Sequence, residues 1–359
     1  MVRKVIISGG GTGGHIFPAV AIANEIQFRY PNAEILFVGA QGKMEMEKVP
    51  QAGYKIIGLP IAGLQRRFTL SNFLLPFKVL SSVMKALKIV NEFKPDVVIG
   101  VGGYASSAIV FAASVKRIPI LIQEQNSYAG LTNKFLANKA KCVCVAYPNM
   151  QTYFPKTPIV LTGNPVRETI YKALTASKTE AKTTLGFDPQ KLVCLIIGGS
   201  LGARTINQAI QAHVQLLHDN GIQLLWQTGQ NFTANIDGLM GIQAQAFIHD
   251  MAAAYAAADM VVSRAGALSI SELSLLSKPS ILVPSPNVAE DHQTKNAMAL
   301  SQVQAAVLVK DQNAMAELHT QMLSLLNDPE ALSQLSHNIA AFSKPNAIKD
   351  IVTQIEQII

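Results

Sequence analysis

Short apolar runs alternate with helix-like segments along the whole 359-residue chain. The runs are continuous rather than alternating in polarity, which is typical of strands buried on both faces of a parallel sheet. Strands separated by helical stretches predict βαβ units. The expected strands are residues 4–8, 34–38, 55–59, 96–101, 119–123 and 142–146 in the first half, and 192–197, 222–227, 245–248, 259–263, 280–284 and 305–309 in the second.

Two sets of strands in a chain of this length predict two α/β domains, each a doubly wound parallel sheet, facing each other across a cleft. A turn-rich stretch, LTGNP at residues 161–165, is the candidate linker. We therefore expect an N-terminal domain over residues 1–163 and a second domain over 164–343. A last helix over 344–359 is expected to pack back on the first domain.

The composition argues against several classes of protein. No run of 18 apolar residues occurs, and the N-terminus lacks the regions of a signal peptide, so we expect neither a membrane span nor a leader. Three cysteines, all in apolar runs, indicate buried reduced thiols in a cytoplasmic protein. There is no Asp-x-Asp motif and no cluster of residues with metal-ligand spacing, so we expect no metal and no cofactor.

The positive charge is concentrated in one segment. Between Leu64 and Lys141 there are eleven basic and three acidic residues, a net charge of +8, whereas the whole chain carries +7. Within it, residues 66–80 (RRFTLSNFLLPFKVL) mix basic and large apolar side chains, which suits either an interfacial segment or a core helix with one wet face. The charge favours an anionic membrane surface as partner, and the absence of a nucleic-acid-binding motif argues against nucleic acid.

The first apolar run leads directly into glycines, GGGTGGH at residues 9–15, followed by a helix expected from about Ala19 to Gln27. Such a loop at a helix N-terminus can bind a phosphate through backbone N–H groups. It also fits the dinucleotide fingerprint, but the strand at 34–38 has no carboxylate at its end to hold a ribose, which disfavours NAD.

The second half contains a similar loop, GGSLG at residues 198–202. These residues also fit the nucleophile elbow of α/β hydrolases, with Asp250 or Asp259 and then His292 in the required order. That interpretation leaves the first half of the chain unexplained, whereas a phosphate-binding loop matches the pattern in the first half.

Two later segments also begin helices. In residues 263–273 (SRAGALSISEL), small residues could approach a phosphate and Glu272 could hold ribose hydroxyls. The alternative is an ordinary strand-turn-helix segment in which the negative charge of Glu272 interacts favourably with the helix dipole. After the loop that starts at Pro284, His292 could be a ligand or base, or only part of a solvated helix start.

Seven motifs, in order and spread over nearly the whole chain, resemble those of the MurG glycosyltransferases. They are GGGTGGH at 9–15 with Pro18, GGY at 102–104, EQN at 124–126, GNPVR at 163–167, GGSLGA at 198–203, RAGA at 264–267 through Glu272, and Gln293 with NA at 296–297. The segment GLQRR at 63–67 departs from the Gly-Leu-Arg-Gly type of the family.

The resemblance implies a GT-B fold and an inverting, metal-independent glycosyltransferase. The donor would be UDP-N-acetylglucosamine. The acceptor would be lipid I (undecaprenyl-pyrophosphoryl-N-acetylmuramyl-pentapeptide) and the product lipid II, the peptidoglycan precursor. The enzyme would act as a peripheral protein on the cytoplasmic face of the inner membrane. A UDP-N-acetylglucosamine 2-epimerase, a glycolipid synthase acting on diacylglycerol and a non-catalytic membrane-docked subunit are the alternatives.

The resemblance also implies which residues bind the substrates, with the donor mainly on the second domain and the first glycine loop also facing the acceptor pyrophosphate. Glu272 would bind the ribose. The positions that match donor contacts are Thr12, Gly13, Gly14, Asn126, Arg167, Ser200, Ile248, Ala267, Leu268, Ser269, Ile270, Ser271, Glu272 and Gln293. His15 is the expected general base, because the positive end of a helix keeps its ring neutral; Glu124 is the next candidate.

Overall fold

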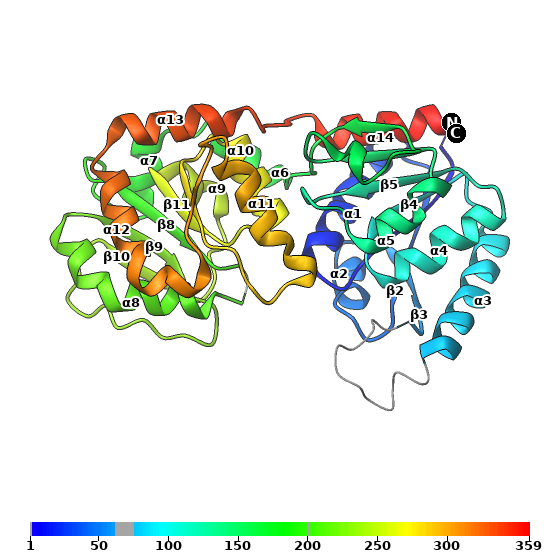
Figure 1. The fold of residues 1–359 in the computed structure, drawn as a ribbon, viewed down its shortest axis with the longest axis horizontal. Coiled ribbons are helices and arrows are strands. Elements are labelled where there is room, and N and C mark those ends of the chain that lie inside the picture. Colours follow the sequence, from blue (N-terminus) through cyan, green and yellow to red (C-terminus); the bar gives the residue numbers. More distant parts are fainter. Residues whose placement is uncertain (1, 62–74, 200) are drawn as a thin grey trace. The chain divides into compact units, whose positions relative to one another are not determined.

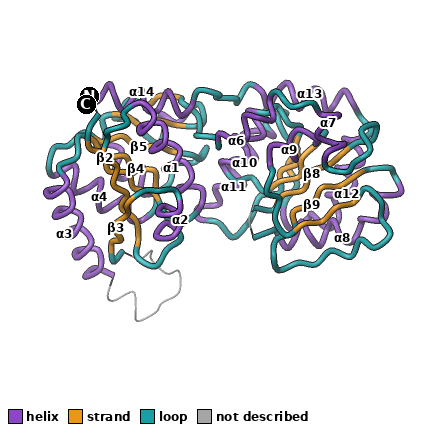
Figure 2. Tube along the Cα trace, turned by 180° about the vertical axis from the view of Figure 1, so that it is seen from behind, coloured by secondary structure: helices purple, strands orange, loops and turns teal. Residues whose placement is uncertain are grey.

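The computed structural model describes residues 2–61, 75–199 and 201–359 (Figure 1). Several sequence predictions therefore lie outside the described residues. They are the departure from the family pattern at residues 63–67, the part of the basic and apolar segment over residues 66–74, which includes Phe73 and Leu74, and the donor candidate Ser200. The chain divides into two compact units. Unit 1 comprises Met1–Val166 and Asn346–Ile359, and unit 2 comprises Arg167–Pro345. Figure 2 shows a sheet flanked by helices in each unit.

The described part of unit 1 contains a seven-stranded parallel sheet in the order β3-β2-β1-β4-β5-β6-β7. Its strands are β1 (Lys4–Gly9), β2 (Glu34–Ala40), β3 (Lys55–Leu59), β4 (Val97–Gly102), β5 (Ile120–Glu124), β6 (Cys142–Val145) and β7 (Ile159–Leu161). The strand order reverses between β1 and β4, and in doubly wound sheets ligands bind at the carboxyl ends of the strands at such a point.

The first six strands confirm the sequence prediction, whereas β7 was missed. This strand is only three residues long and lies at the sheet edge, where its residues are half-buried or exposed. Its last residue, Leu161, falls within the stretch that we predicted to be a linker. A short, partly exposed edge strand lacks the continuous apolar run that identified the others.

The described helices of unit 1 cover both faces of this sheet. They are α1 (Gly13–Arg29), α2 (Glu45–Gln51), α3 (Leu75–Phe93), α4 (Tyr104–Val115), α5 (Leu131–Leu136) and α14 (Ala347–Ile358), with short 3-10 turns between some of them. Helix α14 packs against α1 and contributes Ile351 and Ile355 to the core of unit 1. Arg29 of α1 pairs with Glu356 of α14 at 3.0 Å. The C-terminal helix is thus an integral part of the N-terminal unit.

Helix α1 begins at Gly13, six residues before the expected start at Ala19. Glycine is a poor helix former and proline is disfavoured beyond the first turn, so Gly13, Gly14 and Pro18 together predicted a later start. The loop before the helix is held against the turn after β4, where the Gly10 N–H donates to the Gly102 carbonyl at 3.3 Å. The local sequence preference is overridden by tertiary structure.

The described part of unit 2 contains a six-stranded parallel sheet in the order β10-β9-β8-β11-β12-β13. Its strands are β8 (Val193–Ile197), β9 (Gln223–Gln227), β10 (Ile242–Gln245), β11 (Met260–Ser263), β12 (Ser280–Leu282) and β13 (Val307–Leu308). The strand predicted at residues 245–248 is therefore wrong by three positions. Gly241, with a φ of +81°, makes the turn that starts β10, whereas Ile248 is buried within the loop that follows it.

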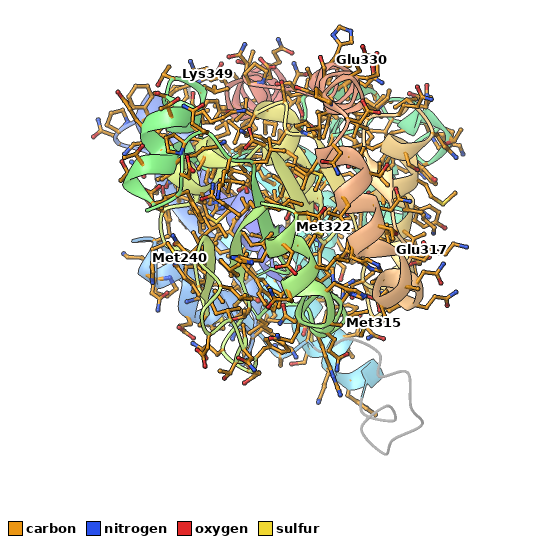
Figure 3. The ribbon with its side chains drawn as sticks, turned by 90° about the vertical axis from the view of Figure 1, so that its left-hand side faces the viewer. Met240, Met315, Glu317, Met322, Glu330 and Lys349 are labelled. Atoms are coloured by element: carbon orange, nitrogen blue, oxygen red, sulfur yellow. The ribbon has the colours of Figure 1, made fainter. Side chains whose placement is uncertain are left out.

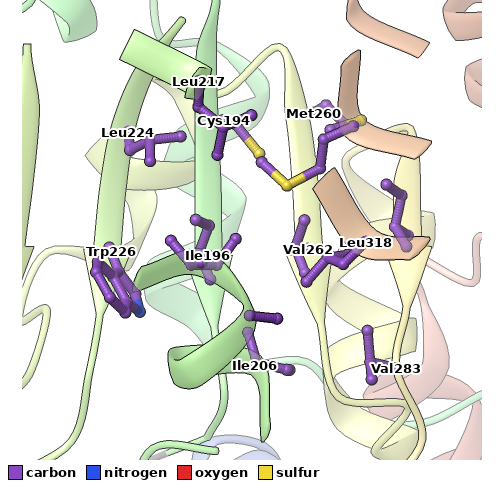
Figure 4. Packing of buried hydrophobic residues seen from close by; sticks show 14 of the residues in the cluster. Cys194, Ile196, Ile206, Leu217, Leu224, Trp226, Met260, Val262, Val283 and Leu318 are labelled. Carbon is purple, nitrogen blue, oxygen red and sulfur yellow. The ribbon is translucent and has the colours of Figure 1, made fainter. Parts of the chain in front are cut away.

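The helices of unit 2 are α6 (Glu168–Tyr171), α7 (Lys178–Thr184), α8 (Arg204–Asp219), α9 (Met251–Ala257), α10 (Ala267–Leu275), α11 (His292–Ser301), α12 (Ala314–Leu326) and α13 (Pro329–Ala340). Helices α8 and α12 pack over one face of the sheet, on a core that includes Cys194, Trp226 and Leu318 (Figure 4). Figure 3 shows Glu317 of α12 and Glu330 of α13 at the surface. Helices α12 and α13 therefore bury one face and expose the other.

All three cysteines are buried and unpaired, as predicted. Among the described residues, no helix is both long and apolar enough to cross a bilayer.

Candidate active site

The glycine loop after β1 lies directly against the turn after β4. The Gly10 N–H donates to the Gly102 carbonyl at 3.3 Å. A Cβ atom at Gly103 would lie only 2.5 Å from the Gly10 carbonyl oxygen, and Gly103 has a φ of +89°. A side chain at Gly103 would thus separate the two loops. The GGY motif therefore serves to hold the first glycine loop in place.

His15 lies in the first turn of α1, whose N-cap is Thr12. Its Nδ1 atom is 2.9 Å from the Gly10 carbonyl oxygen. Because a carbonyl only accepts hydrogen bonds, the proton of the neutral ring is assigned to Nδ1, and Nε2 carries the lone pair. A Cβ atom at Gly102 would lie 2.9 Å from Nε2, so the ring packs on this glycine. The geometry gives His15 the tautomer that a base acting through Nε2 requires.

Glu45 is a buried carboxylate beneath the same loop, and the sequence analysis missed it. Its Oε2 accepts the Gly11 N–H at 2.9 Å and its Oε1 accepts the Ala40 N–H at 3.0 Å. The carboxylate fills the space where a Cβ of Gly10 would be. It lies five residues beyond the end of β2, so the search for an acid at the strand end did not find it. Glu45 thus takes up one backbone N–H of the first glycine loop, the Gly11 N–H.

Glu124, at the end of β5, organises the loop that carries Asn126. One carboxylate oxygen accepts from the Asn126 N–H at 3.0 Å and side-chain N–H at 3.3 Å. The other accepts from the Gly130 N–H at 3.0 Å and from Asn133 Nδ2 at 2.8 Å. Four donors around this buried carboxylate occupy its lone pairs. Glu124 is therefore suited to shaping the loop rather than to proton transfer.

The second glycine loop follows β8 in unit 2 and is packed on the turn after β9. Cβ atoms at Gly202 and Gly229 would overlap the backbone of the facing turn, and both residues have positive φ. Gln227 joins this loop to the one beyond β10, because its Nε2 donates to the Gly199 carbonyl and its Oε1 accepts the Ile248 N–H, both at 2.9 Å.

A buried chain of hydrogen bonds supports the same turn. Trp226 Nε1 donates to Asn207 Oδ1 at 3.0 Å, and Asn207 Nδ2 donates to the Thr228 carbonyl at 2.7 Å. Asn207, like Gln227, is polar within an otherwise apolar packing surface. The sequence signal that could have indicated this support was a polar residue shortly after the GGSLGA motif, Asn207.

Glu272 lies in the second turn of α10 and is buried. Its Oε1 accepts from Arg167 Nε at 3.0 Å and Nη2 at 2.9 Å, and its Oε2 accepts from the Tyr255 hydroxyl at 3.0 Å. Burial raises the pKa of Glu272, and the Arg167 guanidinium opposes that shift. The buried Tyr255 phenol has a pKa well above its usual range, also because of burial. These contacts hold the carboxylate in one orientation.

Two further segments lie near the carboxyl ends of the strands in unit 2. Gln293, at the start of α11, accepts the Ser285 N–H at 2.8 Å and so fixes the loop that precedes its own helix. Arg264, directly after β11, pairs with Asp311 at 2.5 Å and donates to the Val283 carbonyl at 3.0 Å. The start of α10 lies next in the chain, where Gly266 is the N-cap. The unpaired N–H groups of such a helix start are suited to an anion.

The structure thus forms two groups from the predicted site residues. In unit 1 the group consists of Thr12, Gly13, Gly14 and His15, at the N-cap and in the first turn of α1 after β1, and Asn126 in the loop after β5. In unit 2 the group consists of Arg167, Ile248, Gln293 and the helical residues Ala267, Leu268, Ser269, Ile270, Ser271 and Glu272.

The acids invoked for the hydrolase alternative have structural roles instead. Asp250 caps α9 by accepting the Ala253 N–H at 2.9 Å. Asp259 immediately precedes β11 and pairs with Lys178 at 2.8 Å and Lys182 at 2.7 Å. It therefore lies at the amino end of the strand, whereas a nucleophile elbow is at the carboxyl end. Asp259 therefore cannot serve as the acid of a hydrolase triad.

Two family models match the chain in succession. The glycosyltransferase family 28 N-terminal domain matches residues 5–145, and the glycosyltransferase family 28 C-terminal domain matches residues 193–351. The first match includes His15 and Asn126, and the second includes Ile248, Glu272 and Gln293.

The chain is 55% identical to a UDP-N-acetylglucosamine–N-acetylmuramyl-(pentapeptide) pyrophosphoryl-undecaprenol N-acetylglucosamine transferase of Cytophaga hutchinsonii, with 99% of this chain and 97% of the relative covered. It matches the crystal structure of Acinetobacter baumannii MurG with a TM-score of 0.81 at 29% identity, over 99% of both chains. A UDP-N-acetylglucosamine 2-epimerase of Listeria monocytogenes has a TM-score of 0.68 at 12% identity, over 99% of this chain and 96% of the other, which shows the fold alone. The chain therefore belongs to glycosyltransferase family 28 and, within it, to the MurG family.

Proposed function

We propose that this protein transfers N-acetylglucosamine from UDP-N-acetylglucosamine to the muramyl 4-hydroxyl of lipid I, with inversion at the anomeric carbon, to form lipid II for peptidoglycan synthesis. The observation that carries this proposal is the 55% identity, over nearly the full length of both chains, to a relative that is named for this transfer. The proposal is supported in unit 1 by the first glycine loop with His15, and in unit 2 by the second glycine loop and by Glu272 with its partners Arg167 and Tyr255.

We assign the donor to unit 2. The start of α10 and the loop after β8 would receive the diphosphate, because backbone N–H groups and helix N-termini bind anions. Glu272, held by Arg167 and Tyr255, has the carboxylate oxygens to accept hydrogen bonds from the ribose hydroxyls. The Ile248 N–H is already used by Gln227, so Ile248 would contact the base through other atoms.

We assign the chemical step to His15 of unit 1. As the 4-hydroxyl attacks the anomeric carbon, its proton passes to His15 Nε2, the C–O bond to UDP breaks, and UDP leaves with the bonding electron pair. Glu124 is less suited to this role because four donors already surround its carboxylate. The charge on the leaving UDP would be stabilised by helix N-termini and the Arg167 guanidinium rather than by a metal ion.

The purified protein, incubated with labelled UDP-N-acetylglucosamine and a short-chain lipid I analogue, is expected to form the lipid II analogue, identified by mass. Turnover is expected to persist in excess EDTA. Release of free sugar without lipid I would favour the epimerase alternative, and loss of activity in EDTA with recovery in magnesium would contradict the metal-free mechanism.

Replacing His15 by Ala is expected to lower kcat by about 10²–10⁴, the usual contribution of a general base. The affinity for UDP, measured by titration, is expected to change little. The wild-type kcat is expected to fall at low pH because protonated His15 cannot accept a proton, and the His15→Ala variant is expected to lose this acid limb. A His15→Asn variant that keeps most activity and the acid limb would assign His15 to acceptor positioning instead.

Replacing Glu272 by Gln is expected to raise KM for UDP-N-acetylglucosamine about tenfold or more, because a charged hydrogen-bond acceptor of the ribose is lost. The effect on kcat is expected to be smaller. The matched control is 2′,3′-dideoxy-UDP, which lacks the hydroxyls and should bind wild type and variant alike. Equal weakening of UDP and dideoxy-UDP would mean that Glu272 only supports the fold of the site.

We further propose that unit 1 attaches the enzyme peripherally to the anionic cytoplasmic face of the inner membrane. Phe77, Leu80 and Met84 are exposed along one side of α3, at i, i+3 and i+7, and we call them the apolar stripe. Helices α4 and α5 carry further exposed apolar residues, Phe111, Val115, Leu131 and Phe135, near the basic residues Lys116, Arg117 and Lys139. Apolar and basic side chains together suit binding to an anionic interface.

Replacing Leu80 and Met84 by Ser is expected to weaken binding to vesicles of anionic lipid several-fold without changing the fold, since both residues are exposed. Wild-type binding is expected to decrease with added salt and to be weak on neutral vesicles. The control is Met240→Ser in unit 2, which removes a methionine that is 88% exposed. Unchanged binding by the Leu80/Met84 variant, or equal binding of wild type to neutral vesicles, would contradict this surface.

A further inference from the structure

The buried carboxylate of Glu45 and the imidazole of His15 contact the same peptide group from its two ends. Glu45 Oε2 accepts the Gly11 N–H at 2.9 Å. The carbonyl of that peptide belongs to Gly10, and His15 Nδ1 lies 2.9 Å from its oxygen. Because the N–H and C=O of a trans peptide point in opposite directions, the carboxylate, the peptide and the imidazole form one continuous series of hydrogen bonds.

We propose that Glu45 is a positioning residue for His15, acting through the Gly10–Gly11 peptide to hold the imidazole as its Nδ1–H tautomer and to make Nε2 a stronger proton acceptor. A negative charge at the N–H end polarises the peptide, which increases the partial charge on the carbonyl oxygen. That oxygen then accepts the Nδ1–H more strongly, and the protonated ring is stabilised as the proton arrives. This inference rests on the proposed role of His15.

The surroundings of Glu45 are shaped to hold this series in place. The carboxylate is fully buried, and its second oxygen is fixed by the Ala40 N–H at 3.0 Å. Glycines surround it, since a Cβ at Gly10 would overlap the carboxylate and a Cβ at Gly39 would lie 2.6 Å from Glu45 Cγ. On the other side, the absence of a side chain at Gly103 lets its backbone approach the Gly10 carbonyl. Neither end of the peptide can turn without breaking these contacts.

The arrangement resembles in its logic the carboxylate that orients a catalytic histidine directly, with one peptide inserted between the two groups. The charge of Glu45 also counteracts the effect of the helix N-terminus on proton uptake by His15. The N-terminus of α1 disfavours a positive charge on His15 and so opposes proton uptake by the ring. A fixed anion two hydrogen bonds away reduces that opposition at the moment of transfer.

The test compares wild type with Glu45→Gln, which keeps the shape but removes the charge and places an amide N–H₂ against one of the two backbone donors. Nitrogen NMR of protein labelled in its histidines reports the tautomer, and a His15→Asn variant assigns the His15 signal. In wild type at neutral pH we expect the Nδ1–H form, and in Glu45→Gln a mixture of both forms. The matched control is Glu47→Gln, which removes an exposed charge on the same helix.

Kinetics give the second measurement. Glu45→Gln is expected to lower kcat at least tenfold, to move the acid limb of the pH profile of kcat to lower pH, and to leave KM for UDP-N-acetylglucosamine within about twofold. Glu47→Gln should match wild type in all three. A variant with reduced kcat but an unchanged tautomer and acid limb would overturn the proposal, because a purely structural defect gives that result.

The tautomer of wild-type His15 can overturn the proposal even if Glu45→Gln does not fold, because the proposal requires the Nδ1–H form and an Nε2–H form in wild type would contradict it. The NMR result needs neither substrate nor turnover. If His15→Ala retains full kcat, the proposed base is wrong, whereas the tautomer measurement still tests the link between Glu45 and His15. The two failures are therefore distinguishable.

Discussion

Direct backbone contact between loops at the carboxyl ends of neighbouring strands is the constraint on which both site regions depend. In unit 1 the Gly10 carbonyl meets Gly103, and in unit 2 Gly202 meets the turn at Gly229. A side chain at any of these contacts would force the loops apart. The glycine motifs are therefore explained first by contacts within each unit.

The strands beneath these loops make the positions reproducible. They are buried on both faces, and every pair in both sheets is parallel, so their carboxyl ends lie along the same edge. Polar side chains inside this framework then adjust individual loops. Gln227 in unit 2 and Glu124 in unit 1 bond backbone groups of loops that carry site residues, and Asn207 bonds the turn that packs on the second glycine loop. Their role is to fix loop geometry over a rigid sheet.

Much of this architecture follows from the sequence because a strand buried on both faces leaves a continuous apolar run. Strand β7 has only three residues at a sheet edge and leaves no such run. Ile248 is apolar because it is buried in a loop. Its apolar side chain led to a predicted strand at residues 245–248, three positions beyond β10. Candidate site residues were found where a motif marked them, as for His15 and Glu272. Glu45 and Tyr255 could not be found this way, because only the folded chain brings them to Gly11 and Glu272.

The placement of α14 affects the order in which the chain can fold during synthesis. Unit 2 is continuous in sequence and is complete once Pro345 has left the ribosome. Unit 1 begins first, but its core includes Ile351, Val352 and Ile355, which are made after unit 2. The apolar face of α1 that they cover therefore stays uncovered until all of unit 2 has been synthesised. Of the two units, the N-terminal one is thus completed second, and a truncation that removes only α14 would damage the unit whose synthesis began first.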